Sequence, residues 1–116
     1  MVGGNTKIVG VIGDPIEHSL SPRMHNAAFE YLGLDYIYLP FRVSKNDLKN
    51  AVKGVKALNL KGFKVTIPHK VSIIKFLDEI DLTAGRIGAV NTVVNEEGKL
   101  LGFNTDGLGA LEALRE

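Results

Sequence analysis

The sequence predicts an α/β fold, a three-layer sandwich in which a mixed, mostly parallel sheet carries helices on both faces. Short apolar runs rich in β-branched residues alternate with segments whose apolar residues recur at helical spacing. Two further short strands near the end of the chain form a hairpin. The chain has 116 residues, enough for one compact domain with a core and too few for two, so residues 1–116 are expected to form a single domain.

Several segments are expected to be strands. Lys7–Gly13 is a nearly continuous apolar run, as in buried strands of parallel sheets. The other expected strands are Tyr36–Val43, Gly62–Ile67, Ala89–Val94 and Lys99–Asn104. The last two enclose Asn95–Gly98, which we interpret as a four-residue hairpin turn.

The first two expected helices have recognisable starts. Ser21 is a good N-cap and Pro22 a good first helical residue, and Gly33 ends this helix. Its apolar stripe consists of Met24, Ala27, Ala28, Tyr31 and Leu32. The second helix starts at a capping box formed by Ser44 and Asp47. Its apolar stripe consists of Leu48, Val52, Val55 and Leu58, with Lys45, Lys49, Lys53 and Lys56 on a solvated face.

Two more helices are expected later in the chain. Pro68 breaks the third strand and opens a helix that runs to about Ile80. Its inward residues are Val71, Ile74, Leu77 and Ile80. The chain becomes helical again from Thr105, with Leu108, Leu111 and Leu114 on one side.

The composition excludes several classes of function. Hydrophobic residues make up 45% and the net charge is +1, so no strong field attracts nucleic acid or an anionic membrane. No apolar run approaches the roughly 20 residues of a membrane span. Cysteine is absent, which fits a cytoplasmic protein, and His18, His25 and His69 lack the spacing of metal ligands.

Polar residues follow three expected strands where helices are expected to begin. These groups are Ser19 with Ser21, Thr66 with Lys70, and Asn104–Asp106. Ligands of open α/β sheets bind at the carboxyl ends of strands, where helix N-termini favour anions. Two serine hydroxyls there can donate hydrogen bonds to a carboxylate. A cation at a helix start opposes the dipole, so we expect Lys70 to pair with Asp106 and exchange protons with a substrate hydroxyl.

Each of these residues also has an ordinary structural explanation. Ser21 and Asp106 are typical helix caps, Thr66 is typical of strands, and Lys70 is typical of protein surfaces. The functional interpretation therefore depends on their joint placement, which the sequence predicts.

Four motifs in this order resemble those of the shikimate dehydrogenases. They are Ser19-Leu20-Ser21-Pro22 with His25-Asn26, Val65–Lys70 (VTIPHK), Gly88–Thr92 (GAVNT) and Gly102–Gly107 (GFNTDG). The resemblance extends from about Lys7 to Gly109 and is specific because all four motifs occur together. It implies an oxidoreductase that reduces 3-dehydroshikimate to shikimate with NADPH, in aromatic amino acid biosynthesis.

The resemblance also implies roles for individual residues. Ser19 and Ser21 would hold the substrate carboxylate, and Lys70 and Asp106 would form the catalytic pair beside the reacting carbonyl. The resemblance implies that Ser19, Ser21, Thr66, Lys70, Asn91 and Asp106 bind the substrate, and Lys64 is added to this set because of its place on the strand. Lys64 departs from the family, which usually has Asn at this position. By strand alternation Lys64 shares a face with Thr66, so it is expected in the pocket.

The second departure concerns the nucleotide. The family continues into a domain that binds NADP through a Gly-rich turn, whereas Gly107-Leu108-Gly109 is followed by Glu112 where that motif needs glycine. The sequence is therefore interpreted as a truncated, N-terminal substrate-binding domain, without the NADP-binding Rossmann domain. By itself it is expected to bind no NADP and to be inactive.

Two other functions fit the same residues. One is a stand-alone module that binds a small carboxylate, and the other is half of a quinate-using relative. Self-association is also expected, through a face formed by Leu108, Leu111, Leu114 and the open cleft.

Overall fold

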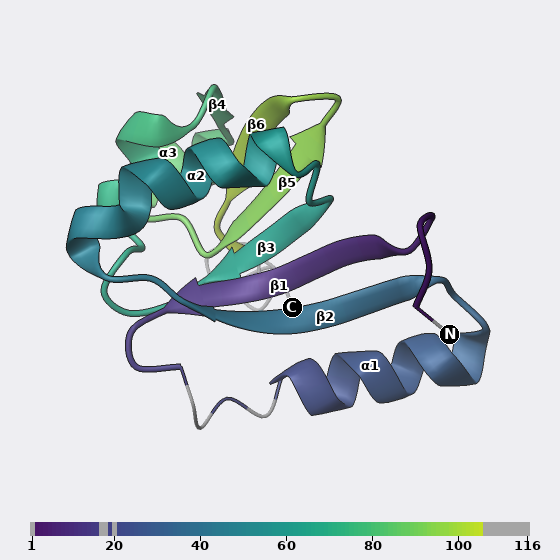
Figure 1. Cartoon of the computed structure of the whole chain (residues 1–116). Helices are drawn as coiled ribbons and strands as arrows, with labels where there is room; N and C mark the ends of the chain where they lie inside the picture. Colours follow the sequence, from purple (N-terminus) through teal and green to yellow (C-terminus); the bar gives the residue numbers. More distant parts are fainter. Residues whose placement is uncertain (1, 17–18, 20, 106–116) are drawn as a thin grey trace, which may run out of the picture.

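The computed structural model of the chain describes residues 2–16, 19 and 21–105 (Figure 1). The helix expected from Thr105 onward, with Leu108, Leu111 and Leu114, lies outside the described residues except for Thr105 itself. The three leucines of the face expected to promote self-association therefore lie outside them as well. Within the described residues, no helix is long and apolar enough to cross a membrane.

Six strands form one sheet in the order β2-β1-β3-β5-β6-β4. The strands are β1 (Lys7–Gly13), β2 (Tyr36–Arg42), β3 (Gly62–Val65), β4 (Glu79–Ile80), β5 (Thr92–Glu96) and β6 (Lys99–Phe103). β1 is parallel to β2 and β3, β4 is parallel to β6, and the β3–β5 and β5–β6 pairs are antiparallel. The expected mixed, mostly parallel sheet is confirmed.

Helices cover opposite faces of this sheet, as the sequence predicts (Figure 1). The helices are α1 (Ser21–Leu32), α2 (Leu48–Ala57) and α3 (Leu82–Ile87), with short 3₁₀ segments η1 (Lys45–Asp47) and η2 (Ser72–Phe76). Adjacent residues of β1 mark the two faces: Val11 packs in a small cluster with Tyr38, and Ile12 packs in the main core. Because strand side chains alternate, one strand contributes to both layers.

The main core lies between the sheet and α2. Leu48, Val52 and Val55 of α2 are buried against Phe63 of β3, and Ile73 of η2 is fully buried. Burial of each such side chain stabilises the fold by roughly 1.5–3 kcal/mol. Leu58, expected in the same stripe, is instead 75% exposed because α2 has already ended at Ala57.

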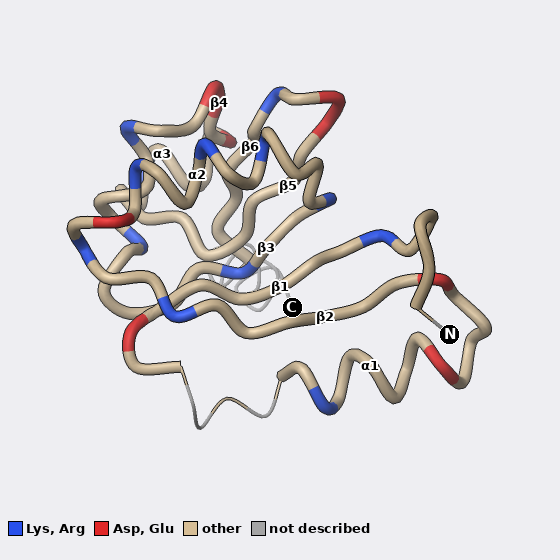
Figure 2. Tube along the Cα trace, viewed as in Figure 1, with Lys and Arg blue, Asp and Glu red and all other residues tan. Residues whose placement is uncertain are grey.

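The outer side of α2 is solvated. All four lysines of the expected solvated face, at positions 45, 49, 53 and 56, are exposed. In Figure 2, basic residues recur along α2, and further basic and acidic residues are spread over the other elements. The expected capping box differs in detail, because the Ser44 hydroxyl donates to the Asp47 carboxylate (3.1 Å) and neither side chain caps a helical N–H.

The apolar stripe expected for α1 does not face the sheet. Met24, Tyr31 and Leu32 are 70%, 90% and 64% exposed. The helix instead approaches the sheet through a half-buried Asn26 and Phe29, with the His25 ring stacked on Tyr38 at 4.4 Å. The physical reason is that β2 is the edge strand of the sheet, so α1 meets backbone polar groups there as well as an apolar surface.

Asn26 satisfies these edge groups. Its Oδ1 accepts a hydrogen bond from the Tyr38 backbone N–H (2.7 Å), and its Nδ2 donates to the Tyr38 carbonyl (2.9 Å). The amide side chain therefore pairs with β2 as a further strand would, and it fixes α1 to the sheet.

The segment after Pro68 is not the long helix that the sequence predicts. Only η2 is helical there, Val71 is 67% exposed, and the chain then pairs with β6 as the short strand β4. Asp78 exchanges hydrogen bonds with Leu100 through its backbone N–H (3.0 Å) and its carboxylate (2.7 Å). A continuous helix would need the Asp78 N–H for its own hydrogen bonds, so pairing with the sheet overrides the helical periodicity.

The next helix, α3, has no counterpart among the expected elements. Asp81 caps it by accepting a hydrogen bond from the Thr83 N–H, and Gly88 ends it with a φ of 79°.

The hairpin is confirmed, but its turn is shorter than expected. Glu96 pairs with Lys99, which leaves Glu97 and Gly98 as a two-residue turn with φ angles of 52° and 92°. The Asn95 carbonyl Oδ1 accepts from the Gly98 N–H (2.8 Å), so Asn95 belongs to β5 while its side chain supports the turn.

We expect Asn26→Ala to lower the free energy of unfolding by about 1–2 kcal/mol, because two hydrogen bonds to β2 are lost. Urea denaturation followed by circular dichroism measures this change. Asn46→Ala, at an exposed position with no side-chain hydrogen bond among the described residues, is the matched control. Equal effects of the two substitutions would show that Asn26 does not fix α1 to β2.

Asp78 should make stability depend on pH. The Leu100 N–H and, next, Lys56 hold the pKa of the Asp78 carboxyl below its ordinary value of 3.8. A lowered pKa means that this stabilisation is complete above the unfolded-state pKa and is lost as the pH falls through the folded-state pKa. Unfolding midpoints at about pH 6 and about pH 3 should therefore fall more in the wild-type chain than in Asp78→Asn. Parallel losses in both proteins would contradict this role.

Candidate functional site

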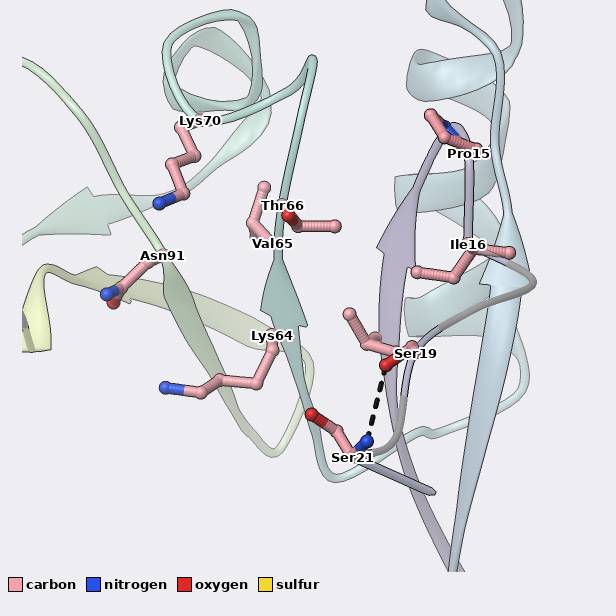
Figure 3. Close-up of a pocket in the computed structure, with 10 residues that line it drawn as sticks. Pro15, Ile16, Ser19, Ser21, Lys64, Val65, Thr66, Lys70 and Asn91 are labelled. Carbon is pink, nitrogen blue, oxygen red and sulfur yellow. Dashed lines mark hydrogen bonds between the residues drawn. The ribbon is translucent and has the colours of Figure 1, made fainter. Parts of the chain in front are cut away.

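A pocket of about 490 Å³ opens beside the carboxyl ends of β1 and β3 (Figure 3). Its described lining residues are Val11, Pro15, Ile16, Ser19, Ser21, Lys64, Val65, Thr66, Lys70 and Asn91. Strands β1 and β3 are parallel neighbours, so the chain leaves both at the same edge of the sheet. This is where open α/β sheets bind ligands.

The pocket brings together six of the seven residues expected to bind substrate. Ser19, Ser21, Lys64, Thr66, Lys70 and Asn91 all line it, although they come from four separate parts of the chain. The seventh, Asp106, lies outside the described residues. Sequence analysis did not anticipate the apolar part of the wall, Val11, Ile16 and Val65, because residues of this kind also fill every core.

The two serines lie at the start of α1. The Ser19 N–H donates to the Ile16 carbonyl (3.1 Å), and the Ser19 hydroxyl accepts from the Ser21 N–H (3.4 Å). In Figure 3 both hydroxyl oxygens lie on the wall of the pocket opposite Lys70 and Asn91. Two hydroxyls beside the N-terminus of a helix of 12 residues suit an anionic oxygen pair such as a carboxylate.

Thr66 comes directly after β3 and lies close against the end of β1. Its N–H donates to the Ile12 carbonyl (3.0 Å), so it continues the pairing of the two strands by one residue. A Cβ at Gly13 would overlap the Thr66 methyl group and lie 3.0 Å from the Ile67 carbonyl oxygen. Only glycine at position 13 leaves room for Thr66 at the pocket wall.

Lys70 lies on the far side of the pocket from the serines (Figure 3). Its carbonyl accepts a hydrogen bond from the Val90 N–H (2.8 Å), which ties this loop to the segment that leads into β5. The expectation that Lys70 sits at the start of an α-helix is wrong, because only the 3₁₀ segment η2 follows it. The argument that Lys70 opposes a helix dipole therefore fails, whereas its place in the pocket is as expected.

His69, next to Lys70 in the chain, has a different role. It is fully buried, and its ring Nε2 hydrogen-bonds the Val43 carbonyl, so it fills the core between β2 and η2. Over the residues that the structure describes, no group of three or more His, Cys, Asp or Glu side chains could hold a metal ion.

Lys64 lies on the pocket side of β3, as strand alternation predicts, while Phe63 and Val65 are buried. Its ammonium donates to the Thr92 hydroxyl (3.0 Å). With Lys70, it gives the pocket two cationic side chains. The electrostatics of this part of the site therefore favour an anionic ligand.

Comparison with known proteins agrees with the four motifs. Residues 11–93 match the family described as the shikimate dehydrogenase substrate binding domain. Over 116 residues the chain is 59% identical to the shikimate dehydrogenase (NADP(+)) of Methanobrevibacter smithii, covering all of this chain and 41% of that protein. The corresponding protein of Pyrococcus furiosus is 59% identical over 114 residues, with 98% and 42% covered.

Solved structures give the same result. A crystal structure of a shikimate dehydrogenase in complex with NADP⁺ is 56% identical with a TM-score of 0.92, covering 98% of this chain and 40% of that one. The shikimate 5-dehydrogenase of Listeria monocytogenes, in complex with shikimate and NAD, is 51% identical with a TM-score of 0.91 and coverages of 98% and 39%. The ligand-free 5-ketofructose reductase of a Gluconobacter strain is 40% identical with a TM-score of 0.90, and the match covers 97% of this chain and 41% of that one.

We expect Gly13→Ala to lower the free energy of unfolding by about 1–3 kcal/mol, because the added methyl group pushes Thr66 away from β1. Chemical denaturation gives the stability, and the Thr66 methyl resonance reports its displacement. Gly54→Ala is the matched control, because a Cβ there meets no atom within 4 Å and alanine favours the helix α2. A Gly13→Ala protein as stable as the control, with an unmoved Thr66 resonance, would contradict the close approach.

Proposed function

Because the chain belongs to the family of shikimate dehydrogenase substrate binding domains, we propose that its pocket binds shikimate and 3-dehydroshikimate. The observation that carries this proposal is the placement of two serine hydroxyls and two lysine ammonium groups around one pocket. In a protein of the relatives' length, this pocket would hold the substrate while NADPH reduces 3-dehydroshikimate in aromatic amino acid biosynthesis. A cytoplasmic location fits such a biosynthetic role.

The carboxylate of the substrate would bind at Ser19 and Ser21. Each hydroxyl can donate one hydrogen bond to a carboxylate oxygen, and the N-terminus of α1 adds partial positive charge. This end of the pocket thereby fixes the direction in which the ring enters. Thr66, directly after β3, and Asn91, directly before β5, would then face the ring hydroxyls.

The chemical step would take place beside Lys70. As hydride reaches the substrate carbonyl, negative charge develops on its oxygen, and the Lys70 ammonium can neutralise this charge by donating a proton. Asp106 would orient Lys70; it lies outside the described residues, so its part in the proposal rests on the motif alone. In the reverse direction Lys70 would accept the hydroxyl proton.

The domain organisation is also a proposal. The chain spans about 40% of the length of the relatives that it matches. We assign residues 1–116 to a substrate-binding domain and assign NADP binding to the part of those relatives that the match does not cover. We expect residues 1–116 by themselves to bind substrate without reducing it.

Titration of the isotopically labelled chain with shikimate tests the binding proposal. We expect saturable shifts of the backbone amide signals of Ser19, Ser21, Thr66, Lys70 and Asn91. Ser19→Ala and Ser21→Ala should each weaken binding about tenfold or more, because each removes a hydrogen bond to a charged group. Ser72→Ala, an exposed serine outside the pocket, is the matched control.

Other ligands separate the competing functions. Quinate bound more tightly than shikimate would favour the quinate-using relative. 5-Ketofructose has no carboxylate, so its tighter binding, unaffected by Ser19→Ala, would contradict the role of the serine pair. Ligand-induced signals confined to other parts of the chain would overturn the assignment of the pocket.

A further inference from the structure

The side-chain oxygen of Asn91 lies at the centre of a hydrogen-bond network. The Thr92 hydroxyl donates to Asn91 Oδ1 (2.9 Å), and Thr105 donates to it twice, from its backbone N–H (3.0 Å) and its hydroxyl (3.2 Å). The Lys64 ammonium contacts both hydroxyls, at 3.0 Å for Thr92 and 3.5 Å for Thr105. Four residues from three separate segments of the chain thus meet at one amide.

The chemistry of Lys64 fixes the direction of every hydrogen bond in this network. An ammonium group can only donate, so each threonine hydroxyl must accept from Lys64 and turn its own proton toward Asn91. The Thr105 backbone N–H can also only donate. All three groups therefore require an acceptor at the same place, which must be the carbonyl oxygen of the Asn91 amide and not its nitrogen.

The amide nitrogen of Asn91, Nδ2, is available to a ligand in the pocket. Asn91 is only 6% exposed and lines the pocket, and the described residues offer its Nδ2 no hydrogen-bond partner. Its backbone cannot turn to compensate, because the Asn91 N–H donates to Phe103 (3.0 Å) and its carbonyl accepts from Val65 (2.9 Å). The amide thus presents two N–H donors to a ligand and no acceptor.

We propose that Thr92 and Thr105 are positioning residues that, together with Lys64, lock the Asn91 amide with its NH₂ group toward the pocket. Neither threonine is among the described lining residues, so both act on a ligand only through Asn91 and Lys64. This wall selects ligands that present oxygen acceptors, such as ring hydroxyls, and rejects an apolar ring. The inference deepens the proposed function and rests on it for the identity of the ligand.

The test compares two ligands that share a carboxylate and differ in their ring oxygens. Shikimate carries three hydroxyls, and 1-cyclohexene-1-carboxylate carries none. Thr105→Val removes the hydroxyl but keeps the backbone donor, Thr105→Ser restores the hydroxyl, and Thr83→Val, outside the pocket in α3, is the matched control. Dissociation constants come from NMR titration, and the Asn91 side-chain NH₂ signals, assigned by their loss in Asn91→Asp, report the amide directly.

In Thr105→Val we expect the preference for shikimate over the hydroxyl-free analogue to fall about fivefold to tenfold, because the loss of one of the three donors to Asn91 Oδ1 loosens the amide and its N–H groups are held less firmly toward the ring hydroxyls. Affinity for the analogue itself should change less than about twofold, since its carboxylate binds elsewhere. Thr105→Ser and Thr83→Val should keep the wild-type preference. An unchanged preference in a folded Thr105→Val protein would overturn the proposal.

A failure of the proposed function can be distinguished from a failure of this inference. If the wild-type chain binds neither ligand, the substrate assignment fails. The hydrogen-bond network is then tested in the ligand-free protein, through the Asn91 side-chain NH₂ signals. We expect the Asn91 NH₂ signals to be displaced in Thr105→Val and in Lys64→Met and to keep their wild-type positions in Thr105→Ser. This result would support a fixed orientation of the Asn91 amide. Signals that stay in place in all three variants would overturn it.

Discussion

The close contact between the ends of β1 and β3 is the constraint on which the site depends. The Thr66 N–H extends the pairing of the two strands by bonding the Ile12 carbonyl, and glycine at position 13 leaves the space that Thr66 occupies. Because both strands end at this point, the loop that carries Ser19 and the loop that carries Lys70 leave the sheet on either side of one pocket. Without this contact the polar residues would still be present, but they would not share a ligand.

The two faces of the sheet have different parts in this arrangement. The face toward α2 is a continuous apolar core that includes Phe63, Val93 and the fully buried Leu100, and it supplies most of the hydrophobic stabilisation. The face toward α1 is held by polar pairing at the edge, through Asn26 and the backbone of β2. α1 begins at Ser21, so the hydrogen bonds that fix the helix also fix one wall of the pocket.

Charge decides what this pocket can bind. Lys64 lies on β3 and Lys70 lies in the loop before η2, and both line the pocket. A lone ammonium group would impose little orientation on a ligand, because it can donate in many directions. Lys64 donates to the Thr92 hydroxyl, and the hydroxyls of Thr92 and Thr105 donate to Asn91 Oδ1. These hydrogen bonds fix the direction in which the Asn91 N–H groups point. The same few residues around Lys64 and Asn91 thus attract an anionic ligand and orient it.

The sequence by itself determined the class of fold, the strand Lys7–Gly13 and six residues that line the pocket, because strand composition and short motifs are local signals. Prediction from the sequence failed where local periodicity competes with hydrogen bonds to the sheet. The helix expected after Pro68 was wrong because Asp78 and β4 pair with β6, and the wrong stripe was expected for α1 because the edge of β2 requires the polar Asn26.

Only the tertiary structure revealed the direction in which Asn91 presents its amide. Lys64, Asn91 with Thr92, and Thr105 lie in three segments of the sequence, and no local pattern links their hydrogen bonds. An amide side chain carries a donor and an acceptor of nearly equal size, so its polarity is set by the groups around it. Those groups come together only when β3, β5 and the residues after β6 have packed.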